Sequence, residues 1–167
     1  MSAKGDPNPA DLQDRLDIRR ARPADGGALV RLLNQLHPTY PPEPEAADEV
    51  IEAASQDPCR ALLVATVDGQ PVGTADLVMV PNMTHGGRPW AVVENVVIDE
   101  PWRGRGIGRA LMDEIDVLTR SAGCYMVQLV SLDHRHDAHA FYASIGYAAV
   151  ARGFRHYLDG FAPTGPA

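Results

Sequence analysis

The segment RGRGIGR at residues 103–109 most limits how this chain can fold, because it places three glycines and three arginines within seven positions. It follows an apolar run, 90–98, and precedes apolar residues spaced as on one side of a helix. Glycine lets a backbone approach a bulky ligand closely, and the first turn of a helix offers unpaired N–H groups to a phosphate. The guanidinium group of an arginine can donate two parallel hydrogen bonds to phosphate oxygens. The segment therefore predicts a strand-to-helix turn that binds a phosphate or diphosphate.

Two familiar phosphate-binding motifs do not fit this segment. The dinucleotide fingerprint G-x-G-x-x-G fails because its sixth position is Arg109 when counted from Gly104 and Leu111 when counted from Gly106. A P-loop would need Gly-Lys-Ser or Gly-Lys-Thr after the turn, and neither follows. A plain structural turn with surface arginines is the alternative, but such a turn does not require three glycines and three arginines together.

The rest of the chain alternates between strand and helix patterns. Strands are expected at 16–20, 61–67, 72–80, 90–98, 125–130, 147–150 and 154–158. Helices are expected at 23–36, 45–54, 107–118 and 137–145, with the proline-rich 37–44 non-helical. This order predicts an α/β domain around a mixed sheet, in which the strand at 90–98 is central and covered on both faces. We expect a disordered tail at 1–14, a flexible tail at 161–167 and a single domain at 15–160.

Composition narrows the class of protein. The formal net charge is −7 and the pI is about 5.2, which argues against a nucleic-acid-binding module, since such a module needs a basic surface. Cys59 and Cys124 lack metal-ligand spacing and are too few for a disulfide framework. No apolar run approaches the length that crosses a bilayer, and residues 1–14 are too polar for a secretory signal. We therefore expect a cytoplasmic protein without membrane or nucleic-acid partners.

Two separate segments of the sequence resemble the GNAT superfamily of N-acetyltransferases. The family's diphosphate loop, [Q/R]-x-x-G-x-[G/A], is met by Arg103, Gly106 and Gly108. The later pattern A-x-x-F-Y-x-x-x-G-Y at residues 138–147 is a second match. The resemblance covers about residues 17–158, with short local similarity to aminoalkylphosphonate and glucosamine-phosphate acetyltransferases. It implies the GNAT fold, a mixed and mostly antiparallel sheet flanked by helices, with acetyl-CoA as co-substrate.

The same resemblance implies where coenzyme A would lie. The strand at 91–98 would diverge from the strand at 125–130, and the pantetheine arm would pair with exposed backbone groups in the gap. A backbone N–H of this strand would stabilise the developing oxyanion. The implied cofactor-binding residues are Val96, Val97, Ile98, Arg103, Gly104, Arg105, Gly106, Ile107, Gly108, Arg109 and Arg135. Arg135 stands where the family often has an asparagine that contacts coenzyme A.

Two side chains are candidates for moving protons. Tyr142 matches the family position whose phenol can protonate the departing thiolate, although it also completes an apolar stripe on its helix. An alkyl amine has a pKa near ~10 and needs a base at neutral pH. Glu94 is the first candidate, because a carboxylate in an apolar central strand would have a raised pKa. The alternative is a structural Glu94 that pairs with an arginine or bonds to a loop.

A polar cluster and two further segments are secondary candidates. His134, His136 and His139 precede the tyrosine and could supply a second-choice base or a substrate contact, or be solvated residues at a helix start. A metal site there is disfavoured because a recognised ligand spacing is lacking. The segments 37–44 and 81–90 would face the substrate, since loops on a rigid scaffold usually set specificity.

The leading prediction is an enzyme that moves acetyl from acetyl-CoA directly to the primary amine of a small molecule. The alternatives are a protein acetyltransferase that uses a lysine or an N-terminus, and a non-catalytic sensor of acyl-CoA. Retention of Tyr142 and Glu94 argues against the sensor, because a pure binder needs neither. A nucleotide-binding regulator is disfavoured by the failed fingerprints. A homodimer is compatible with the sequence.

Overall fold

The computed structural model describes residues 12–40 and 42–158. The chain divides into two compact units, residues 1–129 and 130–167. The expected tail at 161–167 and residues 1–11 of the other tail lie outside the described residues. Residues 12–14 are described, and Leu12 is buried, with 3% of its surface exposed. A single domain over 15–160 stays a prediction.

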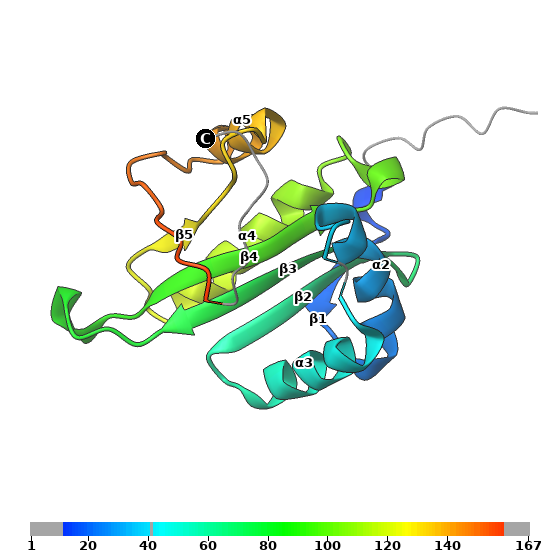
Figure 1. Cartoon of the computed structure of the whole chain (residues 1–167), viewed down its shortest axis with the longest axis horizontal. Coiled ribbons are helices and arrows are strands. Elements are labelled where there is room, and N and C mark those ends of the chain that lie inside the picture. Colours follow the sequence, from blue (N-terminus) through cyan, green and yellow to red (C-terminus); the bar gives the residue numbers. More distant parts are fainter. Residues whose placement is uncertain (1–11, 41, 159–167) are drawn as a thin grey trace, which may run out of the picture. The chain divides into compact units, whose positions relative to one another are not determined.

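A five-stranded sheet forms the centre of the first unit (Figure 1). The strands are β1 Leu16–Arg20, β2 Arg60–Val67, β3 Gln70–Val80, β4 Trp90–Ile98 and β5 Val127–Leu129. They lie side by side in chain order, β1 to β4 pairing antiparallel and β4 with β5 parallel. The predicted mixed, mostly antiparallel sheet is therefore confirmed. Its fifth strand is shorter than the expected 125–130.

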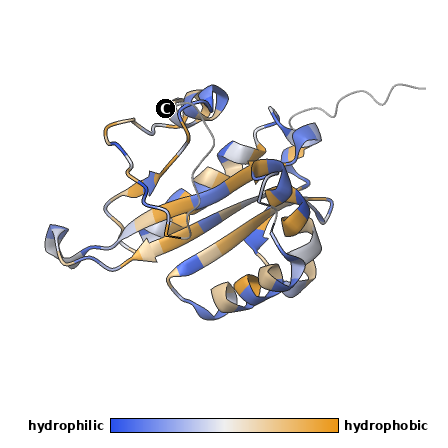
Figure 2. Ribbon diagram, in the orientation of Figure 1, coloured by the Kyte–Doolittle hydropathy of each residue, from blue (hydrophilic) through white to orange (hydrophobic). Residues whose placement is uncertain are grey.

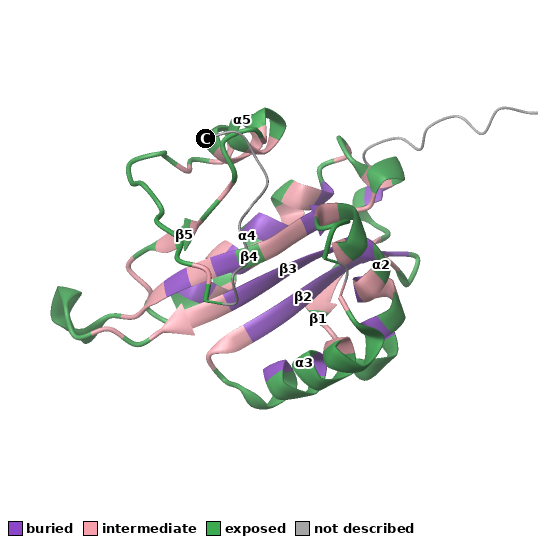
Figure 3. Cartoon of the chain, in the orientation of Figure 1, coloured by how far each residue is buried: buried purple, intermediate pink, exposed green. Residues whose placement is uncertain are grey.

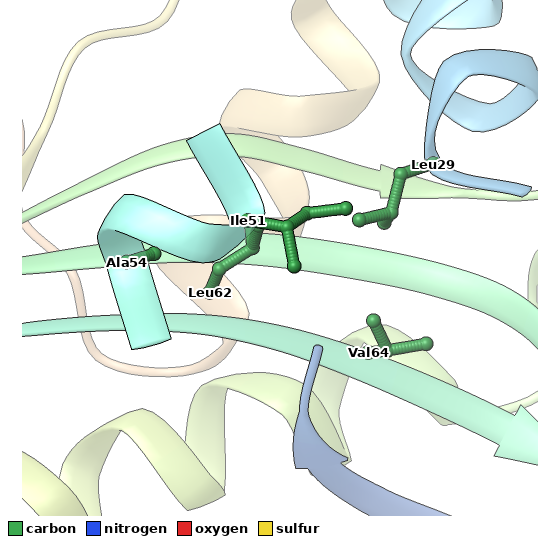
Figure 4. Packing of buried hydrophobic residues seen from close by; sticks show 5 residues of the cluster. All are labelled: Leu29, Ile51, Ala54, Leu62 and Val64. Atoms are coloured by element: carbon green, nitrogen blue, oxygen red, sulfur yellow. The ribbon is translucent and has the colours of Figure 1, made fainter. Parts of the chain in front are cut away.

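Helices cover both faces of this sheet. They are α2 Gly26–Leu36, α3 Pro44–Gln56 and α4 Ile107–Ser121, with short 3-10 turns at Pro23–Asp25, His85–Gly87 and Glu100–Trp102. α2 and α3 pack on one face through a cluster of Leu29, Ile51, Ala54, Leu62 and Val64 (Figure 4). α4 lies on the opposite face (Figure 4), and its buried residues are Ile107, Leu111, Met112, Ile115 and Thr119. This places the expected glycine turn at the beginning of α4.

The core of the unit follows the two inner strands. β2 is buried from Ala61 to Val67, and most of β3 is buried as well (Figure 3). Apolar residues run along these strands, whereas polar residues occupy the outer sides of α2 and α3 (Figure 2). Helices cover both faces of β2, and this accounts for its continuous apolar run. A strand with one solvent-exposed face would instead alternate apolar and polar residues.

The expectation that the strand at 90–98 is covered on both faces is wrong. In β4 the buried residues are Ala91, Val93 and Val97, while the residues between them are half-buried and Glu94 is exposed. The physical reason is the position of β4 near the edge of the sheet, where β5 contributes only three residues. The apolar composition of β4 is therefore not a sign of complete burial.

The second unit contains α5, His136–Ser144. Its half-buried residues, Ala138, Phe141, Tyr142 and the following Ile145, form the expected stripe. The helix ends at Ser144, and Gly146, two residues further on, has φ 93°. The predicted closing hairpin at 147–150 and 154–158 is wrong, because these described residues form no strand. Alternating apolar residues favour a strand but do not supply the neighbour whose N–H and C=O groups it must pair with.

Candidate active site

The glycine turn joins β4 to α4 through left-handed backbone. Gly104 has φ 73° and Gly106 has φ 85°, a region that glycine enters without strain. Gly106 is the residue that caps the beginning of α4. A Cβ placed on either glycine would meet no heavy atom within 4 Å. Open space therefore lies beside the backbone of the turn, and glycine is needed there for conformation rather than for packing against the protein.

The amides of the turn precede the first hydrogen bond of α4. That bond runs from the N–H of Ala110 to the carbonyl of Gly106 at 3.1 Å. The N–H groups of Ile107, Gly108 and Arg109 therefore lie at the positive end of the helix dipole. This end of a helix favours the binding of an anion. Ile107 is buried and fixes this first turn of the helix against the sheet, whereas Arg109 is exposed.

Two of the three arginines hold the turn together. Arg103 donates from Nε to the carbonyl of Ile98 at 3.0 Å. The guanidinium of Arg105 lies 5.5 Å from the ring centroid of Trp102, which is within the range of a cation–π contact. These contacts close the turn back onto the end of β4 and onto the 3-10 turn that follows it. The arginine spacing that predicted phosphate contacts thus also has a local structural role.

A network from α2 holds the chain just before the turn, and the sequence did not reveal it. The Asp99 carboxylate accepts hydrogen bonds from Arg31 at 2.6 Å and from Gln35 at 2.8 Å. Gln35 in turn accepts from the N–H of Glu100 at 3.2 Å. Burial raises the pKa of Asp99, but the hydrogen bonds from Gln35 and Arg31 outweigh it, so its pKa lies below the ordinary value. Gln35 and Arg31 lie 64 and 68 residues before Asp99, and no local sequence pattern predicts contacts over such separations.

β4 contains a bulge directly after Glu94. Asn95 has φ 56°, and the register with β3 shifts there: Glu94 opposes Asp76, but Val97 opposes Thr74. Asparagine tolerates this left-handed conformation better than most residues. The bulge separates the regular part of β4 from the part that leads to the turn. A polar asparagine inside an apolar strand was the available sequence signal for this feature.

The pairing of β4 with β5 ends at the same place. The ladder comprises Ala91 with Val127, Val92 with Gln128 and Val93 with Leu129. Residues 94–98 of β4 therefore continue past the end of β5. The expected divergence of the two strands, which would leave backbone groups of β4 for a ligand to pair with, stays a prediction. Val96 and Ile98, expected near the pantetheine arm, lie in this stretch and are half-buried.

Glu94 lies on the face of the sheet that α2 and α3 cover. It is directly opposite Asp76, and opposite residues of an antiparallel pair project from the same face. Asp76 is bound on both carboxylate oxygens by Arg60. Glu94 is exposed, so the expectation of a carboxylate buried in an apolar strand is wrong. Its candidacy as a base rests on position instead.

Tyr142 and Arg135 belong to the second unit. Tyr142 is half-buried, and its ring centroid lies 5.2 Å from that of Phe141 and 5.9 Å from that of Tyr147. Arg135 is half-buried at the beginning of α5, where its carbonyl accepts the N–H of His139 at 3.1 Å. Tyr142 therefore belongs to the apolar stripe on α5. This is the structural role that was the alternative to a catalytic one.

The histidine cluster is exposed. His134, His136 and His139 are all exposed, and the rings of the last two meet edge to face with centroids 6.2 Å apart. Within the described ranges, no group of three or more His, Cys, Asp or Glu side chains is arranged to hold a metal ion. The histidines thus have the setting of solvated residues at a helix start.

The structure describes side chains from both segments that were expected to face the substrate. In the β3–β4 connection, His85 stacks on Tyr125 with ring centroids 3.9 Å apart, and Asn82 donates to the Thr84 hydroxyl at 2.9 Å. Trp90 at the end of this connection is half-buried. In the proline-rich segment, Tyr40 is 60% exposed.

None of the helices in the described part of the chain is long and apolar enough to cross a membrane.

Comparisons with known proteins agree with the fold described above. The model of a family described as "Acetyltransferase (GNAT) family" matches residues 28–147. Among solved structures, a putative acetyltransferase from Agrobacterium tumefaciens str. C58 superposes with a TM-score of 0.79 and 38% identity, covering 85% of this chain and 99% of that one. The match includes β4, the glycine turn and α5.

Two relatives with named activities are also similar. A glucosamine 6-phosphate N-acetyltransferase of Trypanosoma brucei brucei is 39% identical over 87 residues, which are 52% of this chain and 57% of that protein. An aminoglycoside N(6')-acetyltransferase type 1 of Stenotrophomonas maltophilia is 28% identical over 137 residues, 81% of this chain and 88% of that protein. The chain thus spans little more than half the length of the first relative and most of the second.

Proposed function

Because this chain belongs to the acetyltransferase (GNAT) family, we propose that it transfers the acetyl group of acetyl-CoA to the primary amine of a small molecule. The observation that carries the proposal is the left-handed glycine turn, which sets open space beside the amides that begin α4. A diphosphate fits such a turn, because the helix end supplies both donors and positive potential.

The residues for coenzyme A follow from this placement. The diphosphate lies on the backbone of Gly104, Gly106, Ile107 and Gly108, with the exposed Arg109 beside it and Arg103 and Arg105 holding the turn. The pantetheine arm runs along Val96 to Ile98, where β4 continues beyond the end of β5. Arg135 of the second unit is a further proposed contact, to a phosphate.

The chemistry needs a base and an acid. Acetyl-CoA supplies a thioester whose carbonyl the amine attacks, and a backbone N–H of β4 stabilises the oxyanion that forms. Glu94 is the proposed base, because its exposed carboxylate stands on β4 one residue before the bulge. It accepts the ammonium proton, directly or through water. Tyr142 is the proposed acid, whose phenol donates a proton to the departing thiolate.

The distribution of charge supports a cationic acceptor. Between Arg31 and Arg60 the sequence has no lysine or arginine, and its carboxylates are Glu43, Glu45, Asp48, Glu49, Glu52 and Asp57. All six are exposed. Four of them lie on α3 and the other two flank its ends, and α3 covers the face of the sheet to which Glu94 belongs. Such a surface attracts ammonium groups over several ångströms at low salt. Of the two relatives, one is named a glucosamine 6-phosphate N-acetyltransferase and the other an aminoglycoside N(6')-acetyltransferase. The proposed acceptor class for this chain is an amino sugar.

Other features fit a cytoplasmic enzyme. Cys59 and Cys124 are both free thiols in the structure, as expected in a reducing compartment. Burial raises the pKa of Cys124 above its ordinary value, so this thiol is a poor nucleophile and the proposed transfer is direct rather than through a cysteine. A homodimer, and the lack of a nucleic-acid partner, stay predictions.

The test is turnover with a panel of amines. Release of free thiol from acetyl-CoA is followed with amino sugars, aminoglycosides, polyamines, amino acids and lysine peptides at equal concentration. The proposal expects turnover with an amino sugar above the peptide. Turnover with peptides alone would favour the protein acetyltransferase. Binding of acetyl-CoA by calorimetry without turnover on any amine would favour the sensor.

A further inference from the structure

Gly73 on β3 is the residue against which the end of β4 packs. It is buried and lies opposite Ile98 in the register of the two strands. A Cβ placed on Gly73 would stand 2.6 Å from the Cδ1 atom of Ile98 and 3.2 Å from the carbonyl oxygen of Val97. Both distances are shorter than an ordinary contact, which begins at 3.4 Å. The end of β4 therefore occupies the space that a side chain at position 73 would need.

This glycine differs from the two glycines with positive φ in the turn before α4. A Cβ on Gly104 or Gly106 would meet no heavy atom within 4 Å, and both residues have left-handed backbone. Gly73 is not among the glycines with positive φ, so its backbone conformation does not explain the residue type. Glycine inside a strand weakens it and often marks a place where another backbone approaches closely. Here that backbone is the end of β4.

The stretch that packs on Gly73 is the one proposed to bind coenzyme A. Residues 94–98 of β4 continue beyond the last pair with β5, and the pantetheine arm is proposed to lie along them. The carbonyl of Ile98 accepts the hydrogen bond from Nε of Arg103 at 3.0 Å, which ties the glycine turn to the strand. A displacement of Ile98 would therefore affect both the strand and the arginine that holds the turn.

The space around Gly73 is closed on its other sides. The Cδ1 atom of Leu111 on α4 would lie 3.5 Å from the added Cβ, and Leu111 is fully buried. Beyond Ile98, the N–H of Asp99 donates to the carbonyl of Val72 at 2.8 Å, so the backbone stays bound to β3. Ile98 is only half-buried. Because close-packed interiors resist an added methyl group, the half-buried Ile98 is the neighbour that would give way.

Building on the proposed function, we propose that Gly73 is a positioning residue for coenzyme A, since its missing side chain lets Val97 and Ile98 lie where the pantetheine arm and Arg103 require them. A methyl group at position 73 displaces the Ile98 side chain, and the carbonyl of Val97 has to shift by a few tenths of an ångström. Strand-like pairing with a ligand depends on the placement of these backbone groups, because hydrogen bonds weaken when distance and angle change.

The competing explanation is that Gly73 serves packing alone. Both explanations expect Gly73→Ala to lower the stability of the fold, because an overfilled core is strained. They differ in what the folded variant binds. A packing residue leaves the affinity for coenzyme A unchanged, whereas a positioning residue lowers it. They also differ in rescue, since only the second explanation expects a smaller residue at position 98 to restore binding.

The experiment measures coenzyme A binding to the whole chain by calorimetry. Gly73→Ala should weaken binding by about tenfold. Ile98→Val removes the Cδ1 atom that the added methyl group meets, so the double variant should bind within about threefold of Ile98→Val alone. The control is Ile51→Val, in the cluster on the opposite face of the sheet. It should lower Tm, because it removes a buried methyl group, and leave the affinity unchanged.

Weaker binding by Gly73→Ala that Ile98→Val restores establishes the proposal. Unchanged affinity in Gly73→Ala, or a loss that Ile98→Val does not restore, overturns it. If Gly73→Ala does not fold, Gly73→Ala and Gly73→Val are compared in the Ile98→Val background, where only valine should weaken binding and equal affinities would contradict the proposal. A wild-type chain that does not bind coenzyme A would contradict the proposed function and this role together, whereas wild-type binding with unchanged Gly73→Ala contradicts this role alone.

Discussion

Gly106→Ala separates the two demands on the glycine turn, its backbone conformation and its open space. The φ of Gly106 is 85°, and a Cβ there would meet no protein atom within 4 Å. The protein therefore bears only the cost of a left-handed alanine, about 1–2 kcal/mol. For a chain of this size, that lowers Tm by about 2–8 °C. A methyl group in the space proposed for the diphosphate should in addition weaken coenzyme A binding at least tenfold, about 1.4 kcal/mol.

The matched control is Gly123→Ala at the other end of α4. Gly123 has φ 73°, and a Cβ there would also meet no atom within 4 Å. It follows the 15-residue helix, so it lies about 22 Å from the turn. Thermal unfolding should show a similar loss in both variants, while calorimetry with coenzyme A should show a loss for Gly106→Ala alone. Equal affinities in the two variants would refute the reasoning.

Three further outcomes are expected. Tyr142→Phe should lower kcat by about 10²-fold with little change in acetyl-CoA affinity, since it removes a proton donor. Arg31→Met should raise the KM for acetyl-CoA more than it changes kcat, because Asp99 loses a partner beside the turn. The pKa of Asp25 is lowered chiefly by its hydrogen bond from Arg19, so its contribution to stability is present above the unfolded pKa and fades as pH falls through the folded one. Urea unfolding should show Asp25→Asn less stable by about 3 kcal/mol at pH 7 and nearly equal to wild type at the lowest pH.

Each of these has an outcome that contradicts it. Full activity of Tyr142→Phe would remove the phenol from the mechanism. An unchanged KM in Arg31→Met would mean that the network from α2 is not needed to hold the turn. A constant difference between Asp25→Asn and wild type over the whole acid range would show that the carboxyl's charge is not what stabilises the fold.

Local patterns in the sequence predicted the elements and the turn but not the contacts between them. The strand at 16–20 and the hairpin between β2 and β3 follow from residue spacing, and the glycines at 104 and 106 allow the left-handed backbone that is observed. The bonds of Asp99 to α2 join residues more than 60 positions apart, which no local pattern records. Tertiary contacts decide such features.

Two wrong expectations have one physical origin. Glu94 was expected to be buried because its strand is apolar, and residues 147–158 were expected to form a hairpin because apolar residues alternate there. In the structure Glu94 is exposed, and the apolar Val150 and Phe154 are 87% and 94% exposed. Burial and strand pairing depend on what packs alongside, and a single segment does not contain that information.

The central claim, that the turn binds the diphosphate of coenzyme A, is tested most directly by hydrogen exchange of the backbone amides at 104–109. Adding coenzyme A should slow exchange at these amides and along 96–98, while pantetheine, which lacks the diphosphate, should slow only 96–98. Coenzyme A binding that leaves exchange at 104–109 unchanged would contradict the claim.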